Sequence, residues 1–349
     1  MILTTTIGSY PKPKFLEIPD WFQGDKGTDT DRPTEDWKSA IKILSSNKNK
    51  IIEKALAEVI NDQVVSGIDI VTDGEIRREN YIHYHCRHIN GIDFDHLTKK
   101  TARTGNYDCY LPTINSQVSF TKPFLDSEFK INQKYTLNPV KITIPGPLTI
   151  ADTIANEFYD DNKRLGLDLS KIINKEIKYL ADAGCRYIQI DEPLFARKSK
   201  EAIEYGLENL ERCFYGIEKN IEKIVHICCG YPDKVDSQDY PKAPLESYST
   251  LSDYLEESLI DTVSIEDAHR HNDLALLENF KSTKVILGLV KIASSEIESV
   301  EEIYERIKKA LEHIDSSRII AAPDCGLGYL TREMAMIKLK NLSEAAKLF

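Results

Sequence analysis

Six short segments place groups capable of chemistry directly after apolar runs of the sequence. Three of them supply an imidazole, thiols and a carboxylate: His226 with a neighbouring cysteine, Glu266, and Cys325. These are the ligand types that bind zinc, in the number that completes a tetrahedral site. One such segment alone is more often a helix cap or a packed turn, so a metal site requires that the segments meet. The six are GSY (8–10), DGE (73–75), DEP (191–193), HICC (226–229), SIED (264–267) and PDCG (323–326).

Strand geometry distinguishes between the two adjacent cysteines of HICC. Side chains along a strand point alternately to its two faces, so His226 and Cys228 share one face and Cys229 points to the other. By the same alternation, Ser264 lies on the face of Glu266. We therefore expect His226 and Cys228 to hold one metal together, and Cys229 to face a layer of helices.

Apolar runs alternate with amphipathic stretches along most of the chain, which predicts an α/β fold of the (β/α)8 TIM barrel type. Active-site residues of such barrels come from the carboxyl ends of different strands, which would bring the six segments together. In residues 167–184 the apolar positions recur at helical spacing, and Gly184 suits the end of that helix. Strands are expected at 2–11, 68–75, 140–146, 186–193, 222–230, 260–267, 283–290 and 317–326, and helices at 49–67, 167–184, 200–219, 245–258, 272–280, 299–314 and 332–349.

Two segments, 15–45 and 86–138, break this alternation and are rich in tyrosine and threonine in places. We interpret them as insertions at the mouth of the barrel, with room for a hairpin. There is neither a Pro/Ser-rich linker nor a repeat of the solenoid kind. The expected organisation is therefore a single catalytic domain that spans residues 1–349.

The composition indicates a cytoplasmic protein that binds neither nucleic acid nor membrane. The formal net charge is -11, and no basic run is long enough to form a nucleic-acid-binding face. The first residues do not resemble a signal peptide, and no window approaches the roughly 18 apolar residues of a membrane span. Seven cysteines without framework spacing are typical of reduced thiols, some of which can serve as ligands.

The motifs and their order resemble the catalytic C-terminal barrel of cobalamin-independent methionine synthase, in a single-barrel core form. The similar segments are TTTIGSYPKP, DGEIRREN, PGPLTI, IQIDEP, HICC, SIE and PDCGL, and they extend over essentially the whole chain. The resemblance implies that zinc is bound by His226, Cys228, Glu266 and Cys325. It also implies that homocysteine is bound by Ile7, Gly8, Ser9, Glu75 and Asp191.

The activity implied by the resemblance is transfer of a methyl group to the thiol of homocysteine, which yields methionine. A thiol of pKa about 8.5 is mostly protonated at neutral pH, and zinc promotes its ionisation to the nucleophilic thiolate. As catalytic carboxylates, Asp191 and Glu75 would hold the substrate amino group by charge-assisted hydrogen bonds. Two alternatives are alkyl transfer to another thiol such as coenzyme M, and a non-catalytic zinc-containing barrel that binds an amino acid or a partner protein.

The positions expected around the methyl donor depart from the family pattern. Thr153 stands where the family has a tryptophan that contacts folate, and Ala293 stands where it has a histidine proposed as the proton donor. His269 and His271 are the nearby candidates for that catalytic acid. Methyl-folate has an amine leaving group that needs protonation, whereas a methyl-corrinoid does not. We therefore expect a methyl-corrinoid, free or delivered by a corrinoid protein, to be a better donor than methyl-folate.

Overall fold

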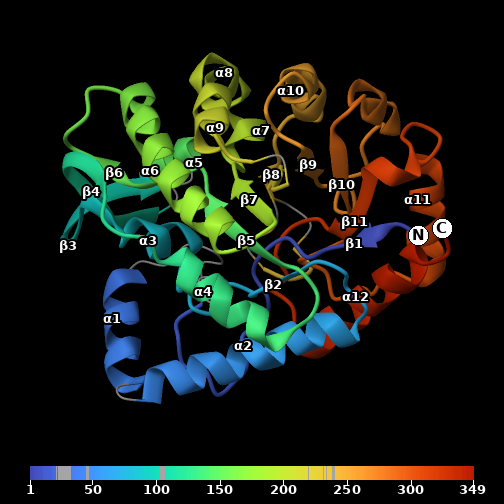
Figure 1. The fold of residues 1–349 in the computed structure, drawn as a ribbon, viewed down its shortest axis with the longest axis horizontal. Coiled ribbons are helices and arrows are strands. Elements are labelled where there is room, and N and C mark those ends of the chain that lie inside the picture. The colour runs from blue at the N-terminus through green and yellow to red at the C-terminus, as the bar shows by residue number, and fades with distance from the viewer. Residues whose placement is uncertain are drawn as a thin grey trace.

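The computed structural model describes residues 1–20, 22, 33–44, 47–102, 107–218, 220–230, 232, 234–237 and 240–349. Its centre is a sheet of eight parallel strands that is surrounded by helices (Figure 1). A parallel bridge between Thr5 and Ile70 joins the two edges of the sheet, so that the strands form a closed barrel. Both termini lie on the same side of the molecule, where the Met1 amino group donates to the Phe349 carbonyl at 2.9 Å.

The order of the strands around the barrel follows the chain, which confirms the predicted (β/α)8 fold. Each strand pairs in parallel with the next, and His226 of β8 lies in register with Asp191 of β7 and with Ser264 of β9. The carboxyl ends of these strands therefore meet at one face of the barrel. The barrel strands are β1 (Leu3–Thr4), β2 (Val71–Thr72), β5 (Val140–Pro145), β7 (Tyr187–Asp191), β8 (Glu222–Ile227), β9 (Thr262–Ile265), β10 (Lys284–Val290) and β11 (Ile319–Pro323).

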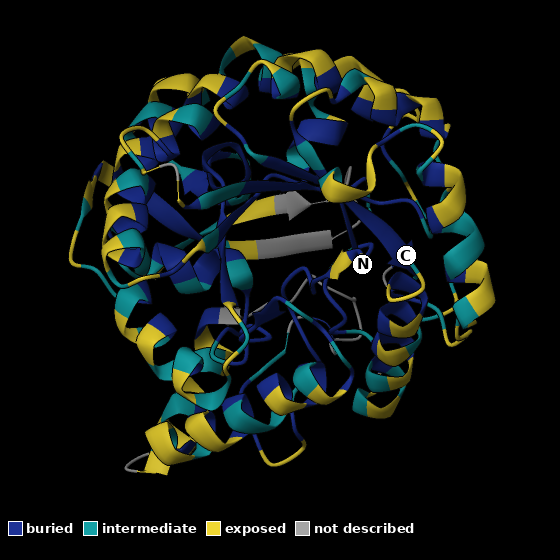
Figure 2. Ribbon diagram, turned by 45° about the vertical axis from the view of Figure 1, so that its right-hand side comes forward, coloured by how far each residue is buried: buried dark blue, intermediate teal, exposed yellow. Residues whose placement is uncertain are grey.

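Each helix turns its apolar face to the barrel and its polar face to solvent, and Figure 2 shows the buried inner and exposed outer surfaces that result. In α6 the apolar residues recur every three or four positions, the side chain of Asp161 caps the first turn, and Gly184 follows the last turn at φ 96°. A glycine adopts this left-handed conformation without a steric penalty. The helices are α1 (Pro33–Leu44), α2 (Lys48–Val65), α3 (Tyr81–Cys86), α4 (Leu125–Asn132), α5 (Pro147–Thr153), α6 (Asn162–Asp182), α7 (Leu194–Arg197), α8 (Ser199–Glu201), α9 (Leu207–Cys213), α10 (Ser247–Glu256), α11 (Val300–Ala310) and α12 (Arg332–Ala346).

A long antiparallel hairpin projects from the barrel within residues 86–138. It consists of β3 (Ile89–Ala102) and β4 (Tyr107–Phe120). β4 also pairs with the short strand β6 (Ala155–Asn156), which follows the carboxyl end of β5 and the helix α5. The hairpin is thereby fixed to the same end of the barrel as the six polar segments. The other segment, 15–45, contains α1, and its residues 21, 23–32 and 45 lie outside the described part of the chain.

Three local predictions need correction. Ladder pairing in the first two strands covers only Leu3–Thr4 and Val71–Thr72, because the chain beyond Thr72 turns at Gly74 and Glu75, both with positive φ. Residues Leu274–Asn279 form a 3₁₀-helix instead of an α-helix. Within 200–219 the helix contains a π-helical turn, Ala202–Gly206, before α9 begins. In each case the apolar spacing predicted the element but not its hydrogen-bond pattern.

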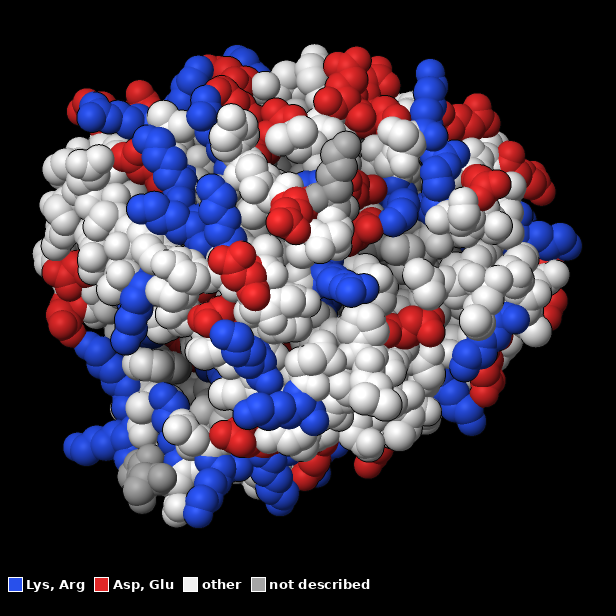
Figure 3. Space-filling model, viewed as in Figure 1, with Lys and Arg blue, Asp and Glu red and all other residues white. Residues whose placement is uncertain are grey.

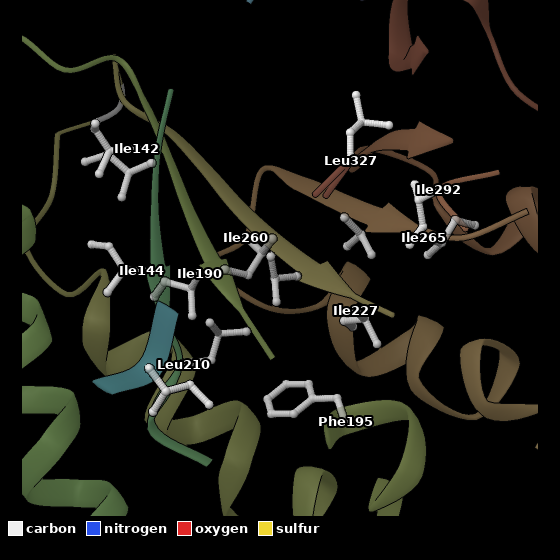
Figure 4. Close-up of a cluster of buried hydrophobic side chains, with 14 of the residues drawn as sticks. Ile142, Ile144, Ile190, Phe195, Leu210, Ile227, Ile260, Ile265, Ile292 and Leu327 are labelled. Carbon is white, nitrogen blue, oxygen red and sulfur yellow. The ribbon is translucent and has the colours of Figure 1, made fainter. Parts of the chain in front are cut away.

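Side-chain alternation along the strands divides the core into two parts. Ile144, Ile190, Ile227 and Ile265 belong to the large cluster between the strands and the helices, part of which Figure 4 shows with Ile227 close to Phe195. A second, smaller cluster fills the inside of the barrel and consists of Ile7, Ile224, Ile286, Ile320 and Ala322. Residues next to an outward isoleucine therefore point inward, and this places Asp191, His226 and Ser264 inside the barrel.

The surface carries charges of both signs without a dominant basic area on the face that Figure 3 shows. This agrees with the formal net charge of -11. Among the described residues, no helix combines the length and the apolar character that crossing a membrane requires.

Candidate metal centre and substrate site

Side chains that can hold a metal converge at the carboxyl end of the barrel strands. His226 lies in β8, Cys228 follows that strand, and Cys325 follows β11. One ligand atom of each lies within 4.8 Å of the other two, and His226 Nε2 is 3.4 Å from Cys325 Sγ. Among the described residues this is the only such group of three or more. The structure thus brings together three of the four residues expected to bind zinc.

The alternation of β8 continues beyond its last residue, Ile227. Cys229 joins Ile227 in the apolar cluster between the barrel and the helices, and it is 2% exposed. It is not part of the group formed by His226, Cys228 and Cys325. The two adjacent cysteines therefore face different environments, as the strand geometry predicts.

A hydrogen bond from the neighbouring strand fixes the orientation of the His226 ring. Nδ1 lies 2.9 Å from Ser264 Oγ, and the two residues are in register on β8 and β9. Because this contact occupies Nδ1, the Nε2 atom is left to face Cys325. Second partners of this kind set the tautomer and the direction of histidines that bind metals.

The two thiols of the group interact with each other as well as with His226. A hydrogen bond from Cys325 lowers the pKa of Cys228 well below its usual value, although burial opposes this effect. The same bond, together with burial, raises the pKa of Cys325. The two sulfurs therefore share a hydrogen bond that favours the ionised form of Cys228. A cation at this point would stabilise both sulfurs as thiolates.

Glu266 follows β9 beside the thiols, and a lysine holds its carboxylate. Glu266 Oε2 accepts from Lys242 Nζ at 3.1 Å, and their side chains are 4% and 11% exposed. The other oxygen, Oε1, is buried and has no hydrogen-bond partner in the described part of the chain. Burial raises the pKa of Glu266, the charges of Cys228 and Asp324 raise it further, and Lys242 opposes them.

This donor set fits zinc. It offers two thiols, an imidazole and a carboxylate, which are the ligands that this ion prefers. A buried oxygen without a partner destabilises a fold by roughly 1–3 kcal/mol, and Glu266 Oε1 is such an atom. A divalent cation among these groups would give that oxygen a partner and would balance the negative charges.

Asp324 connects the segment that carries Glu266 to the one that carries Cys325. Its carboxylate accepts from the backbone N–H groups of residues 267, 268 and 269 at 2.6–2.8 Å. A Cβ atom at Gly288 would lie 2.2 Å from Asp324 Oδ1, so only glycine allows this approach. Burial raises the pKa of Asp324 to about 6. The position of Glu266 thus depends on a carboxylate that precedes Cys325 by one residue.

A second group of acidic side chains lies beside the thiols, where β2 and β5 end. Glu75 Oε1 accepts from Arg78 Nη1 at 3.0 Å and from Thr143 Oγ1 at 2.9 Å. The backbone of Glu75 has φ 57°, which is uncommon for a residue other than glycine and occurs where the surroundings hold a functional side chain in place. Glu75 is therefore fixed in position, and Arg78 balances its charge.

Asp191 forms no ion pair among the described residues, although Arg78 lies near enough to lower its pKa. Its Oδ1 atom accepts from Gln189 Nε2 at 2.7 Å. Burial raises the pKa of Asp191 to about 7; His226 lowers this pKa and Glu75 raises it. A buried carboxyl group with a pKa near neutrality is ready to ionise when a cation, such as an ammonium group, comes next to it.

The first segment, residues 7–9, passes directly over these carboxylates. The Ile7 carbonyl accepts from Gln189 Nε2 at 2.9 Å. A Cβ atom at Gly8 would lie 2.8 Å from Glu75 Oε1. Ser9 Oγ is buried and has no hydrogen-bond partner in the described structure. A free hydroxyl group thus lies in the segment that also contacts Glu75 and the partner of Asp191.

The two histidines expected near the donor lie in different surroundings. His269 Nε2 accepts from the backbone N–H groups of Ile292 and Ala293 at 3.0 and 3.2 Å. Burial lowers the pKa of His269 to about 3, and nearby lysines lower it further. The ring is therefore neutral at pH 7, and its Nε2 lone pair is occupied. This geometry does not favour His269 as a proton donor.

His271 lies in another cavity from His269, between the strand β10 and the helix α11. Its ring is largely exposed, and Nδ1 is 2.8 Å from the Asp267 carbonyl. Thr153 is the last residue of α5. The structure does not bring His271 and Thr153 into the group of thiols and carboxylates.

Two side chains at the site lie outside the sequence motifs. Burial raises the pKa of Tyr81 well above its usual value, and the charges of Asp191, Cys228, Cys325 and Glu75 add to this. The Tyr81 side chain is therefore buried close to both the carboxylates and the thiols. Its only signal in the sequence is its place at the start of the helix that follows the DGE turn.

Lys242 is the second residue of the site that lies outside the sequence motifs. It lies in the segment between β8 and α10, which has no periodic pattern. Besides pairing with Glu266, it lines a cavity of about 450 Å³ together with His269, Arg270 and Lys291. The metal-binding group and this cavity are thus in contact through Lys242.

A (β/α)8 barrel that gathers thiols, an imidazole and carboxylates at the ends of its strands defines a barrel enzyme with a candidate metal centre. The family model described as the catalytic domain of cobalamin-independent synthase matches residues 2–348. The chain belongs to this family, the cobalamin-independent methionine synthases, and it is a methyltransferase.

The similar proteins match this chain over most or all of its length. The chain is 31% identical to the methionine synthase of Saccharolobus solfataricus, with 100% of this chain and 95% of the relative covered. It is 30% identical to that of Sulfolobus acidocaldarius, with 97% and 89% covered. A B12-independent methionine synthase from Shewanella sp. W3-18-1, solved in complex with selenomethionine, has a TM-score of 0.83 at 30% identity, with 100% and 98% covered.

Proposed function

We propose that the chain transfers a methyl group to the thiol of homocysteine and thereby makes methionine, with zinc held by His226, Cys228, Glu266 and Cys325. The observation that carries this proposal is the position of His226, Cys228 and Cys325 close to Asp191, a buried carboxyl group that forms no ion pair among the described residues. Bound zinc supplies the positive charge that ionises a substrate thiol at neutral pH.

The amino-acid end of homocysteine fits the second group of side chains. Asp191, with its pKa near 7 and no ion pair among the described residues, accepts the ammonium group, and Glu75 lies beside it. The free Ser9 hydroxyl group can donate to the substrate carboxylate. A thiol with a sulfonate end, such as coenzyme M, would place a negative charge next to two carboxylates and is disfavoured.

For the donor, we propose a methyl-corrinoid in preference to methyl-folate. In the transfer, the homocysteine sulfur forms a bond to the methyl carbon, and the cobalt–carbon bond breaks with both electrons staying on cobalt. This leaving group needs no proton. Methyl-folate leaves as an amine that does, and general acid catalysis contributes roughly 10²–10⁴ in rate. His269 is neutral and accepts two backbone hydrogen bonds, so it is poorly suited to supply that proton.

The test is a methyl-transfer assay with zinc-loaded protein and homocysteine, offered methylcobalamin and methyl-folate separately. We expect methionine to form faster with methylcobalamin. A rate with methyl-folate that is about tenfold higher, a difference of about 1.4 kcal/mol in barrier, contradicts the proposed donor but not the proposed acceptor.

Two further outcomes separate the alternatives. Methylation of coenzyme M in place of homocysteine would show that the acceptor is a different thiol. If homocysteine binds tightly while no methionine forms with either donor or with a methylated corrinoid protein, the barrel binds an amino acid without turnover. The variant Asp191→Asn serves as a control for the site in each assay.

A further inference from the structure

Lys242 occupies a fixed position between the candidate metal centre and the adjoining cavity. The next residue is anchored by two hydrogen bonds: Ala243 N donates to the Cys229 carbonyl at 2.8 Å, and Arg270 Nη1 donates to the Ala243 carbonyl at 2.8 Å. Lys242 Nζ lies 3.1 Å from Glu266 Oε2. The lysine is therefore a built part of the site and not a mobile surface side chain.

The pairing of Glu266 is at odds with its expected role as a full ligand. The atoms of His226, Cys228 and Cys325 already lie within 4.8 Å of one another, whereas Glu266 does not belong to that group. One of its oxygens is bound to Lys242, and the other is buried without a partner among the described residues. The carboxylate thus stands between a lysine on one side and the thiols on the other.

We propose that Lys242 is a positioning residue that competes with the metal for Glu266 and thereby lowers the affinity of the metal site. This inference rests on the proposed metal site, but it concerns metal affinity and not methyl transfer. The ammonium group weakens metal binding in two ways: it neutralises the carboxylate, and it places a positive charge close to a divalent cation.

The same pair would give Glu266 a partner whenever its carboxylate is not bound to the metal. An isolated carboxylate in this buried position would be unfavourable. With Lys242 at 3.1 Å, the carboxylate stays paired whether or not it contacts the metal.

The test measures the affinity for Co²⁺ without any substrate, by absorption titration of the thiolate bands and by competition with a chelator. The variants are Lys242→Met, Lys242→Arg, Glu266→Gln and the double variant Lys242→Met/Glu266→Gln. Changes at partners of metal ligands typically alter affinity by about 10–100-fold. We expect Lys242→Met to bind Co²⁺ more tightly within this range. Lys242→Arg, which keeps the charge, should restore affinity to about the wild-type value.

The double variant tells whether the effect passes through Glu266. In the Glu266→Gln background, Lys242→Met should change the affinity far less than it does alone. An equal gain in both backgrounds would mean that Lys242 acts only as a nearby charge, and no gain in either would overturn the inference. Lys291→Met, at another lysine of the same cavity, is the matched control and should leave affinity unchanged. Failure of the wild-type protein to bind Co²⁺ at all would instead overturn the proposed metal site.

Discussion

Replacement of Asp191 by asparagine is expected to abolish the pH dependence of amino-acid binding between pH 6 and 8. Burial raises the pKa of Asp191 to about 7, so the carboxyl group of the free protein is half protonated at neutral pH. An ammonium group binds only the ionised form with full strength. Affinity for the amino acid should therefore fall as the pH falls through 7, because protonation of Asp191 competes with binding.

The size of this effect follows from the pKa. With a pKa of about 7, roughly 90% of the Asp191 carboxyl groups are ionised at pH 8 and roughly 10% at pH 6. The dissociation constant should rise by about tenfold between these values, which corresponds to about 1.4 kcal/mol. A hydrogen bond to a charged group contributes about 1.5–3 kcal/mol. The factor by which Asp191→Asn raises the dissociation constant should therefore be large at pH 8 and about ten times smaller at pH 6.

Methionine is the suitable ligand, because its thioether does not ionise and its amino group stays charged over this range. Calorimetric titration of the metal-free protein at pH 6, 7 and 8 gives the affinity, and buffers of different ionisation enthalpy give the number of protons released. The comparison with Asp191→Asn separates this carboxyl group from Glu75, Arg78, His226 and Lys141, which surround it. Binding by the wild-type protein that does not change with pH would refute the reasoning.

Three further predictions concern metal binding and stability. Metal analysis should find about one zinc per chain in the wild-type protein and in Cys229→Ser. Zinc should be lost in Cys228→Ser and Cys325→Ser, since only these two thiols face the site. Retention of zinc in Cys228→Ser would contradict the assignment. Lys141→Met should raise the free energy of unfolding at pH 7 by about 1–3 kcal/mol, because burial lowers the pKa of this unpartnered amine to about 7. The unfolded chain binds the proton more strongly between pH 7 and 10.5, so the gain seen in urea titrations should shrink as the pH rises through this range; a destabilised variant would show that the amine has a role. Asp324→Asn should lower the melting temperature and weaken zinc retention together, because the variant loses the charge that holds three backbone N–H groups. A change in only one of these two properties would show that Asp324 does not couple the stability of the fold to the metal site.

The fold and much of the site were accessible from the sequence because strand alternation is a strong constraint. The placement of Ile190 and Ile227 in the outer core leaves Asp191 and His226 on the inside, and the same rule sends Cys229 away from Cys228. This depends only on the period of two along a strand. It holds for residues at strand ends even where the hydrogen-bonded ladder has stopped.

Other features could not be read from the sequence, since they depend on contacts between segments without a period. Lys242 lies in a loop, and nothing in its neighbourhood marks it as the partner of Glu266. His269 was a candidate acid because Ala293 stands where the family has a histidine. The backbone N–H groups that occupy its Nε2 atom come from Ile292 and Ala293, more than twenty residues away.

The distribution of buried charge explains why the site has two ends with different requirements. Glu75 already has Arg78 as a counter-ion, so the carboxylate that needs a cation is Asp191. At the other end Cys228 and Glu266 lie close together, and Lys242 is the ion-pair partner of Glu266. One end is suited to an ammonium group, which donates hydrogen bonds to oxygen, and the other to a divalent ion that prefers sulfur and nitrogen. A ligand that satisfies both would carry its amino group and its sulfur on one short chain, and for this reason we propose an amino-acid thiol as the acceptor.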